Sequence, residues 1–364
     1  MKICVPDYIR AIKTYTPGKN PDEIKKEVGR PDAVKMASNE NPLGMSPDVR
    51  DAVSRSLKTV NRYPDGSGNE LRACIARKNN VQMENILLGN GSDDIIYMLA
   101  RAFLKENDEA AIPFPSFSMY EIAAKSSGAI PVFAPLKSYS LDPEAIIGAV
   151  TPKTRMIFIC NPNNPTGSIL AKDQFDDLLD RIPSDIPIVV DEAYIEFVRN
   201  KDCMKGIDYI TSKNPVVVLR TFSKIYGLAG LRIGYGIMPA EISGILNRVR
   251  APFNTNSLAQ AAACAALNDD EFANQTKTLA HEGLDFFYAS FDAMGIEYIK
   301  SEANFVLIRL NDSCEAVFNA LLSDGFIARS MASSGLPGHM RVSVGTQAEN
   351  EAFVNALGKI LKKI

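Results

Sequence analysis

The sequence is poor in histidine, and its cysteines do not form closely spaced pairs. The chain of 364 residues has two histidines and six cysteines, and the cysteines are dispersed, with no Cys-x-x-Cys spacing. This set does not match the ligand spacing of a zinc site, so we expect no bound metal. Scattered single cysteines are typical of a reducing compartment rather than of a disulfide framework, which predicts a cytoplasmic protein.

Long hydrophobic runs and an excess of positive charge are missing as well. No apolar run approaches the roughly 18 residues of a membrane span, and the first residues, MKICVPDYIRAIK, lack the apolar centre of a signal peptide. The formal net charge is −3, and the chain has no basic region. We therefore expect small-molecule substrates as partners, and neither nucleic acid nor a membrane.

The order of the predicted elements indicates two domains, as does the length of 364 residues at about 150 residues per domain. In the middle of the chain, continuous apolar strands alternate with helical patterns. That alternation predicts βαβ units and a mainly parallel sheet that helices cover on both faces. The predicted strands are 85–89, 109–114, 131–136, 155–160, 186–190 and 215–221.

The last third of the chain has a different order of predicted helices and strands. An alanine-rich helical stretch over 257–294 is followed by short strands at 303–310 and 340–345. A final helix is expected to begin at the capping box formed by Thr346 and Glu349. These elements predict a smaller α+β domain. We divide the chain into an N-terminal arm over 1–35, a large domain over 45–255 and a small domain over 256–364.

Four segments that follow strands are candidates for chemistry, because ligands of an open parallel sheet bind outside the carboxyl ends of its strands. Strand 215–221 runs into Phe-Ser-Lys, ending at Lys224, and Arg232 comes eight residues later. The neighbours of Lys224 are largely apolar. A buried lysine near another cation has a lowered pKa and a nucleophilic amine suited to a Schiff base. The alternative interpretation is a solvated loop charge.

The segment GNGSDD follows strand 85–89 and opens a helix. Gly89 and Gly91 allow the backbone to approach an anion closely, and Ser92 and Asp93 begin a helix whose free N–H groups favour a phosphate. The segment is not a dinucleotide fingerprint, because its sixth position is aspartate rather than glycine or alanine.

The remaining two strand ends carry a carboxylate and an amide. Asp191 follows strand 186–190, with Tyr194 just after it, and the alternative for Asp191 is a simple helix cap. Strand 155–160 runs into NPNNPTG, a turn that presents the amide of Asn164 at a fixed place or is no more than a tight turn. A Schiff-base lysine, a phosphate cradle and a carboxylate together are what a pyridoxal-phosphate site requires.

Several motifs make the sequence resemble the fold-type-I pyridoxal-phosphate-dependent aminotransferases over nearly its whole length. They include SNENPLG (38–44), YPDG (63–66), NPNNPTG (161–167), VVDEAYIEF (189–197), LRTFSKIYGLAGLRIGYG (219–236) and GHMRVSVGT (338–346). Within that group, the opening arm, SNENPLG and RTFSK resemble the histidinol-phosphate subfamily. The resemblance implies a seven-stranded, mostly parallel sheet with one antiparallel strand between helices, a smaller α+β domain, and a homodimer with shared active sites.

The resemblance also implies residues for the cofactor, pyridoxal 5′-phosphate, which Lys224 would hold covalently. Asp191 would pair with the pyridine N–H, Tyr194 and Asn164 would contact the 3-oxygen, and Phe117 would stack on the ring. The phosphate would be held by Gly91, Ser92, Asp93, Thr221, Ser223 and Arg232. Tyr63 would reach the phosphate of a second subunit, and the alternative for this residue is a plain turn before Pro64. Catalysis itself would fall to Lys224, Asp191 and Tyr194.

The implied reaction is transamination between L-histidinol phosphate and 2-oxoglutarate, giving imidazole acetol phosphate and L-glutamate in histidine biosynthesis. The substrate residues would be Tyr15, Asn39, Asn164, Arg329 and Arg341. Arginine suits a pocket that must accept both a phosphate ester and a carboxylate, although either arginine could be a surface strand charge. The alternative functions are an aromatic amino-acid aminotransferase, a decarboxylase on the same scaffold and a non-catalytic cofactor-binding regulator.

Overall fold

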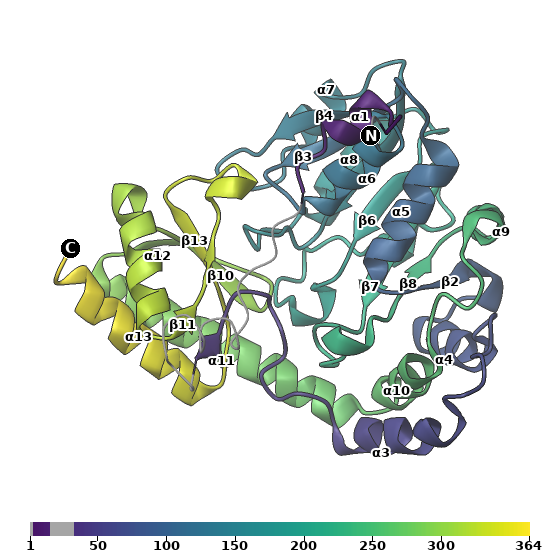
Figure 1. Ribbon diagram of the computed structural model, residues 1–364. Coiled ribbons are helices and arrows are strands. Elements are labelled where there is room, and N and C mark those ends of the chain that lie inside the picture. The colour runs from purple at the N-terminus through teal and green to yellow at the C-terminus, as the bar shows by residue number, and fades with distance from the viewer. Residues whose placement is uncertain (1–2, 15–32) are drawn as a thin grey trace.

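A seven-stranded sheet forms the centre of the larger part of the structure (Figure 1). The computed structural model describes residues 3–14 and 33–364. The strand order is β2-β8-β7-β6-β5-β3-β4, and β8 runs antiparallel to both of its neighbours while the other pairs are parallel. This confirms the mostly parallel sheet with one antiparallel strand. The strands are β2 (Ile86–Gly89), β3 (Glu109–Phe114), β4 (Ile130–Pro135), β5 (Thr154–Cys160), β6 (Ile188–Asp191), β7 (Val216–Thr221) and β8 (Gly234–Ile237).

Helices cover both faces of this sheet because its strands are apolar on both sides. In β7, Val216 and Val218 join the hydrophobic cluster on one face, and Val217 and Leu219 join the cluster on the other. The first face is covered by α4 (Asn69–Asn79), α7 (Pro143–Gly148), α8 (Lys172–Arg181) and α10 (Ser257–Leu267). The second is covered by α5 (Ser92–Phe103), α6 (Met119–Ser126) and α9 (Ala240–Val249).

Side-chain caps explain where several helices begin. Ser46 accepts a hydrogen bond from the Val49 N–H at the start of α3 (Pro47–Ser56), as the Ser-Pro pair predicts. The helical stretch expected over 257–294 is two helices, because the Asp269 side chain accepts from the Phe272 N–H and starts a new helix, α11 (Asp270–Met294). Helix α9 was not expected from the sequence pattern.

The smaller part is built on a four-stranded antiparallel sheet of order β12-β13-β10-β9. Its core contains the stacked rings of Phe287 and Phe291, with Phe353 edge-on to Phe287. The N-terminal segment joins both parts: α1 (Asp7–Arg10) lies near α6, while β1 (Val34–Lys35) pairs with β11 (Phe326–Ile327) (Figure 1). The other elements here are β9 (Glu297–Ile299), β10 (Phe305–Arg309), β12 (Arg329–Ser330), β13 (His339–Ser343), α12 (Cys314–Ser323) and α13 (Gln347–Leu361).

The division into two domains after residue 255 remains a proposal, and the packing of α10 bears on where to draw it. Ala262 and Ala266 of α10 belong to the hydrophobic cluster of the large sheet, next to Leu71 and Ile75 of α4. We propose to draw the boundary between α10 and α11 instead.

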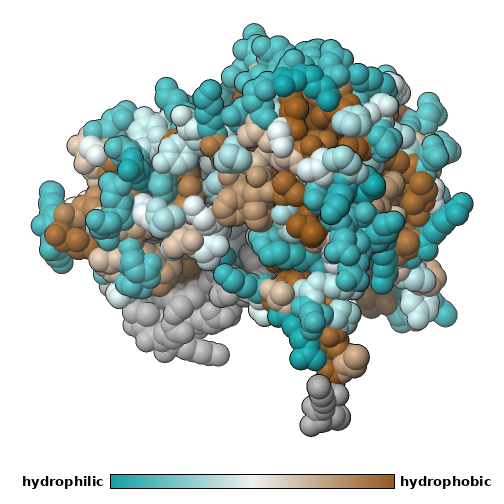
Figure 2. Space-filling model, turned by 90° about the horizontal axis from the view of Figure 1, so that it is seen from above, coloured by the Kyte–Doolittle hydropathy of each residue, from teal (hydrophilic) through white to brown (hydrophobic). Residues whose placement is uncertain are grey.

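On the face seen in Figure 2, hydrophobic surface residues are interspersed with hydrophilic ones and do not form one continuous apolar patch. Across residues 3–14 and 33–364, none of the helices has both the length and the apolar character to span a bilayer. The same part of the chain holds no group of three or more histidine, cysteine, aspartate and glutamate side chains placed to bind a metal ion.

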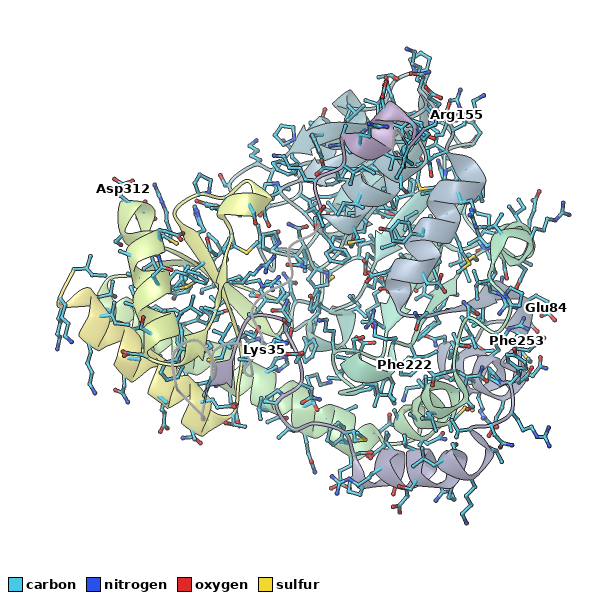
Figure 3. The ribbon with its side chains drawn as sticks, in the orientation of Figure 1. Lys35, Glu84, Arg155, Phe222, Phe253 and Asp312 are labelled. Atoms are coloured by element: carbon cyan, nitrogen blue, oxygen red, sulfur yellow. The ribbon has the colours of Figure 1, made fainter. Side chains whose placement is uncertain are left out.

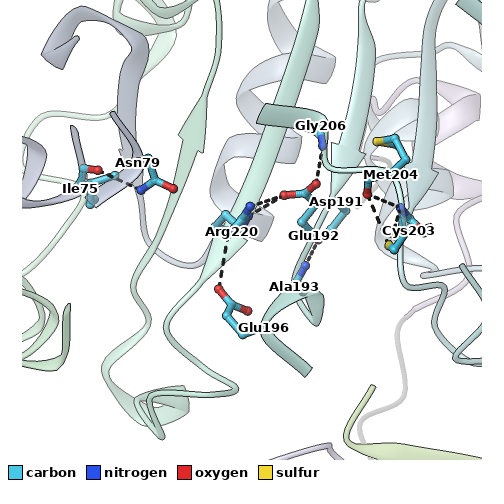
Figure 4. Close-up of polar contacts among 11 residues, drawn as sticks. Ile75, Asn79, Asp191, Glu192, Ala193, Glu196, Cys203, Met204, Gly206 and Arg220 are labelled. Atoms are coloured by element: carbon cyan, nitrogen blue, oxygen red, sulfur yellow. Dashed lines mark hydrogen bonds and ion pairs between the residues drawn. The ribbon is translucent and has the colours of Figure 1, made fainter. Parts of the chain in front are cut away.

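A buried ion pair joins the carboxyl ends of β6 and β7 (Figure 4). The Glu192 carboxylate is fully buried and accepts hydrogen bonds from Arg220 Nε at 2.6 Å and from the Gly206 N–H at 2.6 Å. Arg220 also lies 3.6 Å from the Glu196 carboxylate. Since Asp191 precedes Glu192 and Thr221 follows Arg220, this pair holds two neighbouring strand ends in register.

Replacing Arg220 tests how much this ion pair contributes to the stability of the fold. We expect Arg220→Met to lower the free energy of unfolding by about 3–5 kcal/mol, because it leaves the buried Glu192 charge uncompensated. The matched control is Arg309→Met, which breaks an exposed pair with Glu297 and should cost less than about 1 kcal/mol. Urea unfolding of both variants measures the difference, and equal costs would contradict the proposed role of the buried pair.

Candidate active site

A pocket of about 370 Å³ lies at the edge of the large sheet where β5, β6 and β7 end. The register explains why these ends meet: Cys160 pairs with Asp191, Asp191 pairs with Leu219, and Thr221 pairs with Gly234. The smaller part closes the pocket with Arg329, Met331, Ser334 and Arg341, and the 37–40 segment forms another wall.

Most of the residues that the sequence pattern singled out line this one pocket. They are Asn39, Ser92, Asp93, Phe117, Asn164, Asp191, Tyr194, Thr221, Ser223, Lys224, Arg232, Arg329 and Arg341. Gly91 is not in the lining but directly precedes Ser92. Tyr63 is not in it either, and Tyr15 lies outside the described residues. Residues far apart in sequence are thus brought together, and their individual roles remain proposals.

Lys224 enters the pocket from the turn that follows β7. The Thr221 hydroxyl accepts from the Ser223 N–H at 3.1 Å, and the fully buried ring of Phe222 anchors the turn in the core (Figure 3). The amine Nζ donates to the Ser38 carbonyl at 3.0 Å. Burial, together with the positive charge of Arg341, lowers the pKa of Lys224 to about 8. With a pKa of about 8, roughly a tenth of the amine is neutral, and nucleophilic, at pH 7.

Asp191 ends β6 and faces the same pocket. Its Oδ2 accepts from the Tyr120 hydroxyl at 2.8 Å, and its Oδ1 accepts from the Ala193 N–H at 3.1 Å. Burial raises the pKa of Asp191 to about 6, and the two hydrogen bonds oppose that rise. The group is a carboxylate at pH 7, buried and able to stabilise a positively charged N–H in the pocket.

The start of α5 forms an anion cradle beside these groups. Gly91 caps the helix with φ 81°, and a Cβ atom at this position would lie 2.5 Å from Arg232 Nη2. At Gly234, a Cβ atom would lie 2.6 Å from the Ser92 nitrogen. Both glycines therefore permit close approach of the backbone to Arg232 and to the first helical N–H groups. Arg232 and a helix N-terminus are together suited to hold a phosphate.

A second cationic group, Arg341, reaches into the pocket from β13. Its Nη1 donates to Asn164 Oδ1 at 2.5 Å and its Nη2 donates to the Ala37 carbonyl at 2.5 Å. The guanidinium lies 5.3 Å from the centre of the Phe305 ring. Asn164 precedes a cis peptide bond to Pro165. These contacts tie the two parts of the protein together at the pocket.

Tyr194 and Asn39 form a further link between the two parts. The Tyr194 hydroxyl accepts from Asn39 Nδ2 at 2.9 Å, and Asn39 Oδ1 accepts from the Ser343 hydroxyl at 2.9 Å. Asn39 has φ 53° and is 1% exposed, so its left-handed backbone is held by these buried contacts.

The sequence analysis gave no role to Ser38 and Glu40, which line the pocket, or to Tyr120, which lies outside the lining but contacts Asp191. Ser38 accepts from Lys224, Tyr120 donates to Asp191, and Glu40 lines the wall while paired with Lys35 at 2.9 Å. Tyr120 had a usable signal, since it lies three residues after Phe117 in a helical pattern. Ser38 and Glu40 lie in the SNENPLG motif, but the motif does not show that the backbone carbonyl of Ser38 meets Lys224.

Comparison with known proteins shows the family to which the chain belongs. Residues 31–357 match the family model described as aminotransferase class I and II. The chain belongs to the class I and II aminotransferases. The aminotransferase class that the sequence resemblance implies is thereby confirmed.

This aminotransferase is similar to curated relatives over almost its full length. It is 42% identical over 354 residues to the histidinol-phosphate aminotransferase of Moorella thermoacetica, covering 97% of this chain and 92% of that protein. It is 43% identical over 355 residues to the one of Caldicellulosiruptor saccharolyticus, covering 98% and 99%. The crystal structure of the Sinorhizobium meliloti histidinol-phosphate aminotransferase, solved with pyridoxal-5′-phosphate, has a TM-score of 0.90 at 24% identity, covering 98% and 97%. That likeness confirms the fold.

Proposed function

We propose that this aminotransferase moves the amino group of L-histidinol phosphate to 2-oxoglutarate, giving imidazole acetol phosphate and L-glutamate, with pyridoxal 5′-phosphate bound covalently at Lys224. The observation that carries the proposal is the pairing of a partly buried lysine and a buried aspartate in one pocket, next to the anion cradle of α5. Identities of 42% and 43% to histidinol-phosphate aminotransferases support the choice of substrate.

The residues around the pocket fit pyridoxal phosphate. When bound, this cofactor supplies a ring that withdraws electrons from the α-carbon of the substrate. Asp191 would hold the proton on the ring nitrogen, Phe117 would support the ring face, and Asn164 with Tyr194 would contact the 3-oxygen. The phosphate would be held by Gly91, Ser92, Asp93, Thr221, Ser223 and Arg232.

Lys224 has two tasks in this proposal. Its amine would hold the cofactor, and once free, Nζ would take the proton from the α-carbon of the substrate and return it later in the reaction. A pKa of about 8 suits both directions, because a group that titrates near the working pH acts well as base and as acid.

The arginines of the smaller part account for substrate recognition. Arg341 and Arg329 face the pocket from β13 and β12. The anion site must take the phosphate ester of histidinol phosphate in one half of the reaction and a glutamate carboxylate in the other. The planar fork of an arginine pairs with both anions. A contact from Tyr15 to the substrate phosphate stays a prediction.

The experiment compares two amino donors on the same enzyme. Cofactor-loaded protein is mixed with L-histidinol phosphate or, at the same concentration, with phenylalanine, and the loss of the visible cofactor band is followed. We expect the loss to be at least about ten-fold faster with histidinol phosphate, because only this donor presents a phosphate to the arginines. Lys224→Ala is the control and should show no such loss with either donor. A faster loss with phenylalanine would favour the aromatic aminotransferase instead.

We also propose that the enzyme is a homodimer in which each active site takes a residue from the other subunit. The position of Tyr63 supports this. This side chain is 82% exposed and stacks on Phe253 at 4.6 Å, and it does not line the pocket of its own chain. Phe253 itself lies at the outer edge of the larger part (Figure 3). Exposed apolar side chains also occur in the neighbouring sequence at Leu43, Met45, Leu57 and Val60. If a partner subunit covers Tyr63, the Tyr63 hydroxyl would contact the cofactor phosphate in the active site of that partner.

Mixing two inactive subunits tests whether sites are shared. Lys224→Ala retains Tyr63, and Tyr63→Ala retains Lys224, so a hybrid dimer contains one complete site if Tyr63 acts across the interface. We expect about half of the wild-type activity per hybrid dimer, measured after refolding the two variants together. Activity no higher than the mean of the two separate variants would contradict the shared site.

A further inference from the structure

Tyr120 touches two groups that the proposed function assigns to the cofactor ring. Its hydroxyl donates to Asp191 Oδ2 at 2.8 Å, and its ring meets Phe117 edge-on at 5.5 Å and 83°. The ring is also stacked on Phe158 at 4.9 Å and 12°. Tyr120 is 0% exposed and lies in α6, so its hydroxyl has a fixed direction.

The Asp191 carboxylate is held at both oxygens by these surroundings. Oδ2 is fixed by Tyr120 from α6, and Oδ1 is fixed by the Ala193 N–H of its own strand end. Each carboxylate oxygen can accept a further hydrogen bond, so both remain able to meet a donor in the pocket. Without the hydroxyl of Tyr120, only the backbone would determine how the carboxylate is turned.

We propose that Tyr120 is a positioning residue, which orients the Asp191 carboxylate toward the ring nitrogen of the cofactor and supports Phe117 against the ring face. The inference rests on the proposed function and assigns a residue that the sequence motifs do not include. Tyr120 does not touch the reacting atoms, and acts through Asp191 and Phe117.

The electrostatic surroundings determine the direction of the pH effect. Burial raises the pKa of Tyr120 well above its ordinary value, so its hydroxyl stays a donor, and burial raises the pKa of Cys160 to about 12, so that thiol stays neutral. The charged and titratable groups acting on Asp191 are Tyr120, Asp93, Glu192, Cys160 and Tyr194. The Tyr120 hydrogen bond favours the carboxylate, so losing it raises the pKa of Asp191. The loss also frees the carboxylate to turn away from the ring nitrogen, and this misorientation weakens its hold on the ring proton.

The test is Tyr120→Phe in the cofactor-loaded enzyme. The ring and its packing remain while the hydroxyl is lost. We expect the acid limb of the kcat/KM profile to move to higher pH by about one to two units, because a hydrogen bond to a charged group is removed. The cofactor should bind about ten-fold more weakly by equilibrium dialysis. The pH midpoint of the visible band of the cofactor should also rise. A ring nitrogen that is less fully protonated carries less positive charge, so the Lys224 nitrogen would stay protonated up to a higher pH.

Two controls separate the hydrogen bond from packing. Tyr209→Phe removes a hydroxyl that donates to the Asp176 carboxylate at 2.6 Å, away from the pocket, and should leave the profile, the band and the cofactor affinity unchanged. Phe158→Leu loosens the stack on Tyr120 but keeps the hydroxyl, and should lower thermal stability with little shift of the band midpoint.

The outcomes distinguish this inference from the proposed function. A wild-type protein that neither binds the cofactor nor turns over would overturn the function itself. If the wild type is active and Tyr120→Phe has the same pH profile, band midpoint and affinity, the positioning role is wrong. An equal midpoint shift in Phe158→Leu would also overturn it, because packing alone would then account for the effect.

Discussion

The partial burial of Lys224, in the turn that follows β7, is the constraint on which the rest of the site depends. An amine that lines a protein pocket loses part of its hydration, and near Arg341 its charged form is disfavoured further, which makes the neutral nucleophile available. The same burial raises the pKa of Asp191 at the adjacent strand end, yet leaves it below neutral pH because Tyr120 and Ala193 donate to it. One pocket thus keeps an amine partly neutral and a carboxylate charged.

Residues from both parts of the protein form that pocket. The large sheet supplies the strand ends, and the buried pair of Glu192 and Arg220 keeps β6 and β7 aligned behind them. The smaller part supplies Arg341, which both contacts Asn164 and lowers the pKa of Lys224. Substrate recognition and activation of the lysine are therefore coupled through one guanidinium, and an anion bound to Arg341 would weaken its effect on the amine.

Much of the fold and most of the site could be predicted from the sequence, since they follow from local patterns. Apolar strands that end in polar residues place Asp191 and Lys224 at one edge of a sheet, and the family motifs supply the remaining assignments. The break between α10 and α11 was missed because helical propensity is high on both sides of Asp269, and only its cap reveals the new start. Tyr120 was missed because its importance lies in a tertiary hydrogen bond to a residue 71 positions away. No pattern in one chain could show whether the exposed Tyr63 meets a partner.

The most direct measurement identifies the lysine that carries the cofactor. Protein loaded with pyridoxal phosphate is reduced with borohydride, which makes the linkage permanent, then digested and analysed by mass spectrometry. The account predicts the added mass on the peptide that contains Lys224, with none after incubation of Lys224→Ala under the same conditions. Stoichiometric label on another lysine, or full turnover by Lys224→Ala, would contradict it.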